Sequence, residues 1–363
     1  MTRGEELTIE ERVGRVHDVL AAARRLADPN DPLGEEARRL LPAATGLSEA
    51  GVELGLSRHL ETSASDEDLE RLVARAGNAP RVHVLLSANV FVAVVRAVAL
   101  AVAASRSVRV RPSSREAVMA PLLHRAAADA TGGAPFAICE RVESSPGDVM
   151  HVYGRLETID AVERESRPGV RVVGYGPGFG VALVDARSDP LPLAAERLSW
   201  DVIAFDQRGC LSPRVALVHG SVADAEAFAD RLAAALDERD RQVPRGALTG
   251  DERREQALYH RTMSAVGRCH AGATFIVGVD PAPRALMLPP SGRHVHVARI
   301  EETSDLARLL EPFQNAVTCV GRNDPESSMT RSLVTLLRGA RSLPLGRMQS
   351  PPLDGPVDLR GML

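Results

Sequence analysis

The sequence predicts an α/β protein with two domains, each built on a mostly parallel sheet. From residue 81 onward, short apolar runs alternate with longer helix-like segments, as in repeated βαβ units. Several of these runs, such as residues 82–86 and 181–184, are apolar throughout, which is typical of strands buried on both faces. The chain has 363 residues, of which 44% are hydrophobic, so it is long enough to build two cores.

The first 78 residues are expected to form acidic covering helices without chemistry of their own. Thr8 is followed three residues later by Glu11, which is a capping-box pattern at a helix start. Ser65 precedes three acidic residues and then Leu69, which indicates a second capped helix.

The strand-like runs then follow in order. They occupy residues 82–86, 108–111, 136–138, 151–153, 170–173, 181–184, 215–218, 275–279, 294–300 and 316–320. Helices are expected from about residue 90 to 104, after Pro112, and from 224 to 237. Residues 238–255 are highly charged and predict an exposed helix or loop, and residues 344–363 are expected to run extended over the surface.

Composition excludes several kinds of chemistry. None of the 44 basic residues is a lysine, so a Schiff base, a pyridoxal phosphate anchor and a Walker-type phosphate loop are excluded. The net charge of -4 argues against nucleic acid as the main partner. No apolar run is long enough to span a membrane, no signal peptide is evident, and the four cysteines lack metal-binding spacing. We therefore expect a cytoplasmic protein with no metal and no membrane span.

The segment from Phe205 to Pro213 carries the clearest chemical signal. It places Cys210 on a glycine-containing turn directly after an apolar run. A cysteine there can supply both a nucleophilic sulfur and a backbone N–H for the oxyanion that forms beside it, which suits acyl transfer through a thioester. The alternative reading is a small buried hydrophobic residue, as most free cysteines are.

The pattern Phe-x-Gln-x-Gly-Cys at 205–210 resembles the active-site segment of the aldehyde dehydrogenase superfamily. The longer Asp-Gln-x-Gly-Cys-Leu-Ser-Pro at 206–213 resembles its acyl-CoA reductase branch, which includes the reductase subunit of the bacterial bioluminescence fatty-acid reductase. The resemblance implies an aldehyde dehydrogenase-like fold with a parallel-sheet dinucleotide-binding domain and a second α/β catalytic domain. Accordingly, we expect an N-terminal helical region at 1–78, a dinucleotide-binding domain at 79–205 rejoined by about 325–363, and a catalytic domain at 206–324.

The same resemblance implies roles for specific residues. Cys210 is the expected nucleophile, and Asn89 lies where the superfamily places an oxyanion-hole asparagine, although a turn residue after a strand is the alternative. Arg111 and Ser113 match a segment that contacts the adenosine ribose, and Ser114 stands where NAD-preferring members carry a glutamate. Because Ser114 and Arg115 can accept a 2′-phosphate, NADP(H) is expected, with NAD(H) as the alternative. Arg111 and Arg115 could instead only solvate a helix start. The remaining expected cofactor-binding residues are Ser87, Gly154 (at the pyrophosphate) and Gly176.

Gly174 is the most discriminating departure from the hydrolytic members of the superfamily. They carry at this position a glutamate that activates water against the acyl-enzyme, and a glycine cannot act as this base. The family's C-terminal Pro-His-Asp-Gly reads Pro-Val-Asp-Leu at 356–359, so its histidine is missing.

These features predict NADPH-dependent reduction of an acyl thioester, bound to CoA or to a carrier protein, to the aldehyde, by an enzyme expected to be a homo-oligomer. Two alternatives stay open: an acyltransferase between thiols with a degenerate cofactor site, and a non-catalytic partner subunit.

Overall fold

The computed structural model describes residues 7–88 and 90–362, which divide into two compact units. The first unit comprises residues 1–45, 52–177 and 352–357, and the second comprises 46–51, 178–351 and 358–363. The division at 177/178 differs from the boundary predicted at 205/206. Strand β6 (Phe179–Asp185) is hydrogen-bonded between β7 (Pro213–His219) and β11 (Val317–Arg322), so it belongs to the second sheet.

The first unit begins with a helical region. It contains α1 (Ile9–Ala27), α2 (Pro32–Thr45), α3 (Glu49–Leu54, with its first residues in the second unit), the π-helical turn η1 (Gly55–His59) and α4 (Asp66–Ala76). The predicted capping box is present: Glu11 N–H donates to Thr8 Oγ1 (3.1 Å), and Thr8 N–H donates to Glu11 Oε2 (2.8 Å). Ser65 likewise caps α4, so the helix starts follow from the sequence.

A five-stranded parallel sheet forms the body of the first unit. Its strands are β1 (Val82–Leu85), β2 (Val108–Arg111), β3 (Ala137–Ile138), β4 (Val149–Tyr153) and β5 (Arg171–Tyr175), in the order β3-β2-β1-β4-β5. The order reverses between β1 and β4, which is the switch point where open α/β sheets bind ligands at the carboxyl ends of their strands.

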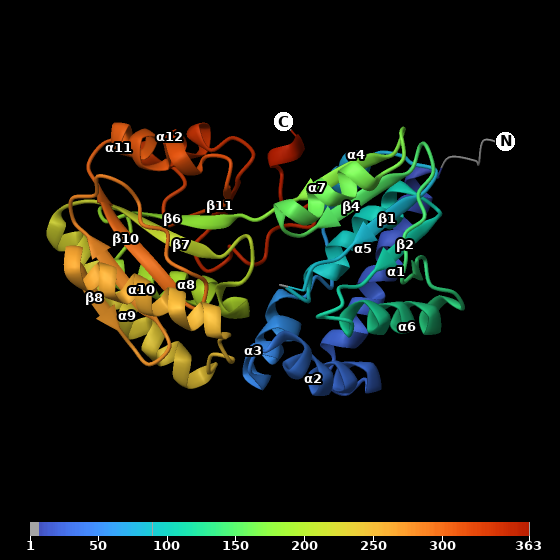
Figure 1. The fold of residues 1–363 in the computed structure, drawn as a ribbon, viewed down its shortest axis with the longest axis horizontal. Helices are drawn as coiled ribbons and strands as arrows, with labels where there is room; N and C mark the ends of the chain where they lie inside the picture. The colour runs from blue at the N-terminus through green and yellow to red at the C-terminus, as the bar shows by residue number, and fades with distance from the viewer. Residues whose placement is uncertain (1–6, 89, 363) are drawn as a thin grey trace. The chain divides into compact units, whose positions relative to one another are not determined.

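Helices cover both faces of this sheet (Figure 1). Helices α5 (Ala93–Ala104) and α6 (Met119–Thr131) connect β1, β2 and β3 on one face, and α7 (Leu156–Glu165) covers β4 and β5 on the other. Right-handed crossovers require this arrangement once the strand order reverses. The returning segment 352–357 is held by Arg96, whose Nη1 donates to the carbonyls of Pro352 (2.9 Å) and Gly355 (2.8 Å).

The second unit contains a seven-stranded sheet in the order β12-β11-β6-β7-β10-β9-β8. Its other strands are β8 (Arg268–Ala271), β9 (Ile276–Asp280), β10 (His294–Ile300) and β12 (Arg341–Pro344). All neighbours are parallel except β8 and β9. Strands β8 and β12 were not predicted from the sequence, because they are short edge strands with little apolar periodicity.

Figure 1 shows α8 and α9 on one face of the second sheet and α11 and α12 on the other. The helical segments are α8 (Leu191–Ile203), η2 (Ala204–Gln207), α9 (Val222–Gln242), α10 (Gly250–Val266), α11 (Thr303–Leu310), η3 (Glu311–Phe313), α12 (Ser328–Leu336) and η4 (Arg360–Met362). A core between the sheet and α11 and α12 includes Leu183, Leu217, Ile300, Leu309 and Leu333. No helix in the described part of the chain is both long and apolar enough to cross a bilayer.

Candidate active site

A cavity of about 460 Å³ opens in the first unit at the carboxyl ends of β1, β2 and β4. Six of the seven predicted cofactor-binding residues line it: Ser87, Arg111, Ser113, Ser114, Arg115 and Gly154. These residues come from three separate strand ends, so the sheet, and not proximity in sequence, gathers them. Gly176 is not among the lining residues.

Glu116, which was not predicted from the sequence, holds the loop between β2 and α6 in place. Glu116 is buried, and its Oε1 accepts the N–H groups of Val118 and Met119, both at 2.9 Å. Burial raises the pKa of the Glu116 carboxyl, and these two hydrogen bonds oppose part of that rise. Because Glu116 points inward, the cavity wall formed by Ser114 and Arg115 is free of its charge.

The charge of the cavity is positive. Among the described residues that line it, three are arginines (Arg111, Arg115 and Arg155) and none is acidic. Arg111 and Arg115 are exposed, so their guanidinium groups are accessible to a bound anion.

Each of the three glycines near α7 has a different local environment. The N–H of Gly154 donates to the carbonyl of Tyr175 (3.2 Å), and an added Cβ there would meet Thr158 at an ordinary 3.5 Å. Contacts within the protein therefore leave room for a side chain at position 154. At Gly174 an added Cβ would lie 2.5 Å from Ile159 Cγ2, and at Gly176 it would lie 3.1 Å from Leu156 Cδ2. Gly174 and Gly176 thus allow close packing of α7.

Cys210 lies in the second unit, after three consecutive residues with left-handed backbone conformation. Phe205, Asp206 and Gln207 have φ values of 53°, 50° and 63°, although none is a glycine. Such a run is unfavourable for side-chain-bearing residues and persists only where the surroundings over-determine it.

Two buried side chains of that run hold it in place. Asp206 Oδ1 accepts from Arg293 Nε (2.9 Å), and its Oδ2 accepts from the Gly246 N–H (2.9 Å). Gln207 Nε2 donates to the carbonyls of Pro213 (2.6 Å) and His294 (2.7 Å). Gln207 Oε1 accepts the His294 N–H (2.8 Å), so this residue ties the turn to the starts of β7 and β10.

The thiol of Cys210 is half-buried, and its peptide is held by β11. The Thr318 hydroxyl donates to the Cys210 carbonyl. Burial raises the pKa of the Cys210 thiol to about 11, and the Asp358 carboxylate acts in the same direction. Arg360, the N–H of Cys210 itself and Arg341 oppose this rise.

Asn89 lies outside the described residues, so its predicted pairing with Cys210 stays a prediction. The cavity belongs to the first unit and Cys210 to the second.

Comparison with known proteins decides the family. A family model described as acyl-CoA reductase (LuxC) matches residues 52–363. The chain belongs to this acyl-CoA reductase family. It is 25% identical over 171 residues to the long-chain acyl-protein thioester reductase of Aliivibrio fischeri, a match that covers 46% of this chain and 34% of that protein.

Solved structures of aldehyde dehydrogenase type share the fold. The NADP-dependent glyceraldehyde-3-phosphate dehydrogenase of Bacillus halodurans, in complex with NADP, matches with a TM-score of 0.60 at 15% identity, over 94% of this chain and 79% of that one. An NAD-dependent aldehyde dehydrogenase of Sinorhizobium meliloti matches with a TM-score of 0.65 at 14% identity, over 94% of this chain and 75% of that one. The predicted aldehyde dehydrogenase-like α/β fold is thereby confirmed.

In this member of the acyl-CoA reductase family, a second cavity adjoins the first. It measures about 470 Å³ and shares Leu85 and Arg111 with the first cavity. Met150 and Val162 add to its apolar floor, and Glu140, Arg141 and Glu165 supply charged groups. This second cavity was not predicted from the sequence, because part of its wall comes from the irregular loop after β3.

An aromatic pair that the sequence reading missed also belongs to this region. Tyr153 lines the first cavity and stacks on Tyr175, with ring centroids 4.4 Å apart and planes 14° apart. Tyr175 Oη lies 3.0 Å from His151 Nδ1, and burial lowers the pKa of His151 to about 4. A neutral imidazole thus fixes the tyrosine stack beside the cavity.

Two histidines on β10 lie inside the second unit of this family member. His294 and His296 are fully buried, and burial lowers their pKa values to about 3 and about 4. Within the described residues, no group of three or more His, Cys, Asp or Glu side chains could hold a metal ion.

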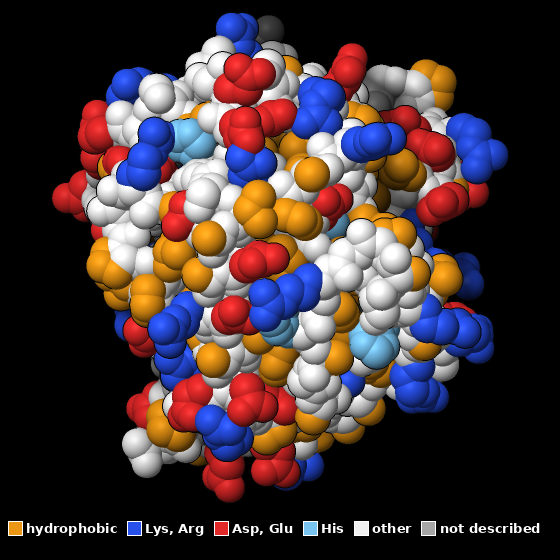
Figure 2. Space-filling view, turned by 90° about the vertical axis from the view of Figure 1, so that its left-hand side faces the viewer, with side chains coloured by type: hydrophobic (Ala, Val, Ile, Leu, Met, Phe, Trp, Pro, Cys, Tyr) orange, Lys and Arg blue, Asp and Glu red, His pale blue; other side chains and the backbone are white. Residues whose placement is uncertain are grey.

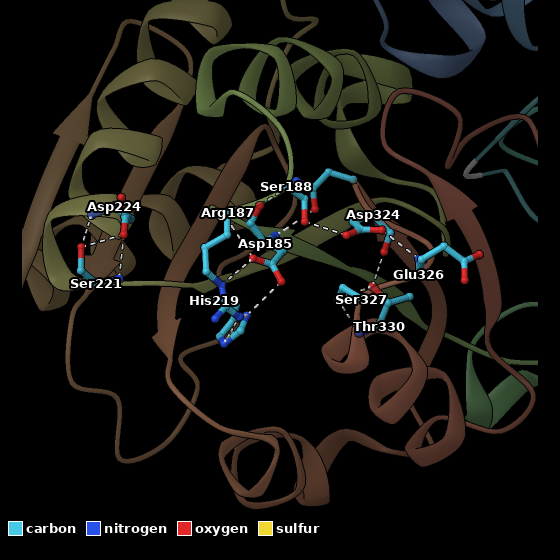
Figure 3. A network of polar contacts seen from close by, with 11 residues as sticks. Asp185, Arg187, Ser188, His219, Ser221, Asp224, Asp324, Glu326, Ser327 and Thr330 are labelled. Atoms are coloured by element: carbon cyan, nitrogen blue, oxygen red, sulfur yellow. Dashed lines mark hydrogen bonds and ion pairs between the residues drawn. The ribbon is translucent and has the colours of Figure 1, made fainter.

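A polar network lies at the opposite end of β7 from Cys210 (Figure 3). There Asp185 Oδ2 is 3.1 Å from His219 Nδ1, and Ser188 Oγ donates to Asp324 Oδ2 (2.6 Å). Strand β7 has seven residues, so its ends are about 20 Å apart. His219 is therefore not the base of Cys210, and the network instead ties together the loops after β6, β7 and β11.

Proposed function

We propose that this chain reduces an acyl thioester to the aldehyde with NADPH, by way of a thioester on Cys210. The observation that carries the proposal is the cavity at the switch point of the first sheet, which gathers six of the predicted cofactor residues. Membership of the acyl-CoA reductase family and the strained, anchored turn before Cys210 support the same assignment.

The residues present fit a phosphorylated dinucleotide. Arg111 and Arg115 would pair with a 2′-phosphate, while Ser113 and Ser114 offer hydroxyl groups to the ribose. The apolar floor of the adjoining cavity suits the face of a base, and Tyr153 presents an aromatic ring to the first cavity. When bound, the cofactor would supply hydride.

Cys210 carries the covalent chemistry in this proposal. Its thiolate sulfur attacks the acyl carbonyl carbon, the bond from that carbon to the departing sulfur breaks, and the CoA or carrier thiol leaves after taking up a proton. The Cys210 N–H, fixed by the turn anchored through Asp206 and Gln207, donates to the oxyanion. Reduction of the acyl-enzyme carbonyl by the bound cofactor would then break the carbon–sulfur bond to Cys210, which releases the aldehyde and returns Cys210 as the thiolate.

The absence of a carboxylate at Gly174 supports thioester chemistry over hydrolysis. A glutamate at the same backbone position would place its Cβ against Ile159. Gly174 offers no carboxylate to activate water, which supports an acyl-enzyme that is preserved for reduction or for transfer to a thiol.

We expect wild-type protein to bind NADPH more tightly than NADH, because charge-assisted contacts from Arg111 or Arg115 read the 2′-phosphate. Replacing Arg115 with alanine should weaken NADPH binding by about 1.5–3 kcal/mol while leaving NADH binding nearly unchanged. Calorimetric titration of both cofactors measures this difference, with the exposed Arg261 of α10 replaced as control. If the wild type binds both cofactors with equal affinity, Arg111 and Arg115 do not recognise the 2′-phosphate.

Asn89 is proposed as the second oxyanion donor. Replacing it with alanine should lower the rate of aldehyde formation by about two to three orders of magnitude, with little change in NADPH affinity. Single-turnover kinetics with acyl-CoA measures the chemical step. A loss smaller than about threefold would show that Asn89 only shapes the turn after β1.

A panel of acyl-CoAs with NADPH tests the function as a whole, by following the loss of NADPH absorbance and trapping the aldehyde. An acyltransferase would exchange acyl groups between thiols without consuming NADPH, and a non-catalytic subunit would do neither.

A further inference from the structure

Thr318 of β11 is a buried residue in direct contact with the segment that carries the nucleophile. It is completely buried, and its hydroxyl donates a hydrogen bond to the carbonyl of Cys210. The carbonyl of Phe179 is a second acceptor within reach of this hydroxyl, at 3.3 Å. Thr318 and Cys210 are 108 positions apart in the chain, so the second sheet brings them together.

A β-bulge accounts for the direction of the Thr318 side chain. Val317 pairs with Phe179, and Cys319 pairs with Gly180. Two consecutive residues of β6 thus face three residues of β11, and Thr318 is the extra one. A bulged residue is left out of the regular pairing, and a bulge commonly re-aims a side chain. The hydroxyl of Thr318 is therefore available for a contact outside its own strand pair.

Two glycines at the start of β6 make room for this contact. A Cβ added at Gly178 would lie 2.4 Å from Thr318 Cγ2, and one added at Gly180 would lie 2.4 Å from the carbonyl oxygen of Leu211. The N–H of Gly180 also donates to the carbonyl of Ser212 (2.8 Å). Side chains at 178 and 180 would push Thr318 and the backbone after the nucleophile away from β6, so the close approach requires both glycines.

The two peptide groups that flank the Cα of Cys210 are each held at their carbonyl oxygen. The carbonyl of Gly209 accepts the N–H of Ser212 (3.1 Å), which fixes the peptide that contains the Cys210 N–H. The carbonyl of Cys210 accepts the Thr318 hydroxyl, which fixes the peptide on the other side. Because each peptide group is planar, the Cα of Cys210 is held from both sides, and so are the directions of its Cα–Cβ bond and its N–H.

We propose that Thr318 is a positioning residue, which holds the Cys210 backbone so that the sulfur and the oxyanion-binding N–H meet the same acyl carbonyl group. The inference rests on the proposed function, in which Cys210 forms the acyl-enzyme. Attack needs the carbonyl carbon at the sulfur and the carbonyl oxygen at the N–H at the same time. Without the Thr318 hydroxyl, the Cα of Cys210 is free to tilt about its remaining anchor, which separates these two requirements.

Replacing Thr318 with valine tests the proposal, because valine keeps the branched shape and removes the hydroxyl. Two reactions of Cys210 are compared in the full-length protein without NADPH: acylation by the acyl-CoA panel and alkylation by iodoacetamide. In alkylation the sulfur bonds to the methylene carbon, iodide leaves and the thiol proton passes to buffer, so no oxyanion forms. Mass spectrometry of the Cys210 peptide follows both reactions separately from the other three cysteines.

Thr318→Val should lower the rate constant of acylation by about ten- to a hundredfold, since a small misplacement at a reacting centre costs this much. The rate constant of alkylation should change by less than about threefold, because it depends on the thiolate and on access to it. A merely structural role would instead lower the fraction of protein that reacts, and it would do so in both reactions.

Two control variants separate the hydrogen bond from the loss of any buried hydroxyl. Thr318→Ser keeps the hydroxyl and should restore most of the acylation rate. Thr330 is a buried threonine of α12 in the same unit, and its hydroxyl donates to the carbonyl of Asp324 (2.6 Å). Thr330→Val makes the same chemical change away from Cys210 and should leave both reactions at the wild-type rate.

Each outcome decides the proposal. Slow acylation with intact alkylation in Thr318→Val, together with recovery in Thr318→Ser, supports it. An unchanged acylation rate, or an equal loss of both reactions, overturns it. If Thr318→Val does not fold, Thr318→Ser and Thr318→Ala decide, because they differ only by the hydroxyl, and equal acylation rates in these two overturn the proposal.

A failure of the proposed function looks different from a failure of this inference. The wild type itself would then carry no acyl group on Cys210 with any member of the panel, and the inference would fall with it. If the wild type is acylated and Thr318→Val is acylated as fast, the proposed function stands and only the positioning role of Thr318 is lost.

Discussion

Replacing Cys210 with alanine is expected to abolish aldehyde formation from acyl thioesters while NADPH binding persists. The proposed covalent step needs a sulfur at this position, and Cys210 is the only cysteine between Phe205 and Pro213. The residues that line the cofactor cavity come from the first unit, so the substitution removes none of them. Steady-state turnover with acyl-CoA, together with calorimetric titration of NADPH, measures both properties.

Cys269 supplies a matched control for this substitution. It is a half-buried thiol of the same unit, on the edge strand β8. Cys269→Ala should therefore retain wild-type turnover. Substantial aldehyde formation by Cys210→Ala would eliminate the covalent mechanism.

Replacing Arg293 with alanine should have the largest effect on stability. Arg293 and Asp206 are almost completely buried, and Arg293 Nη1 also pairs with Asp240 at 3.0 Å. Removing the guanidinium leaves the buried Asp206 carboxylate without its counter-charge, which costs about 3–5 kcal/mol. The left-handed run before Cys210 would lose one of its two anchors, so turnover should fall as well.

Urea unfolding followed by tryptophan fluorescence measures this loss. The single tryptophan, Trp200, lies in α8 of the same unit and has the Arg239 guanidinium 4.3 Å from its ring, so it reports on this unit. As a control, Arg254→Ala removes an exposed ion pair with Asp251 and should change the free energy of unfolding by less than about 1 kcal/mol. If Arg293→Ala also lowers the free energy of unfolding by less than about 1 kcal/mol, the buried Asp206–Arg293 pair does not hold the turn.

The sequence predicted the features that depend on strand order. Ser87, Arg111, Ser113 and Gly154 each follow the end of an apolar run, and a parallel sheet brings such ends to one edge. The helix starts at Thr8 and Ser65 were predictable because capping depends on neighbours three residues away.

What the sequence could not show depends on contacts between distant residues. Asp206 and Arg293 are 87 positions apart, so nothing in the Cys210 segment indicates its buried partner. The role of Gly174 in packing against Ile159 requires the position of α7, and the stacking of Tyr153 on Tyr175 requires the register of β4 and β5. The division between the units lies at 177/178 and not at 205/206 for a similar reason, because the apolar run of β6 does not reveal which sheet it joins.

Charge patterns illustrate the same limit on the surface of the molecule. Arginines and acidic side chains are interspersed over the face shown in Figure 2, as the near-balanced composition leads one to expect. One local arrangement matters for the chemistry: the described residues that line the first cavity include three arginines and no acidic residue. It becomes visible only when the strand ends are assembled.

The most direct test of the central claim runs the reaction backwards. The protein is given an aldehyde and NADP⁺ without any thiol, and NADPH formation is followed over time while acylation of Cys210 is measured by mass spectrometry. Because Gly174 cannot activate water, one equivalent of NADPH should form per active site, Cys210 should carry the acyl group, and the reaction should then stall until CoA or a carrier thiol is added. Continuous production of the carboxylic acid without a thiol would contradict the account, because another residue would then supply the missing base.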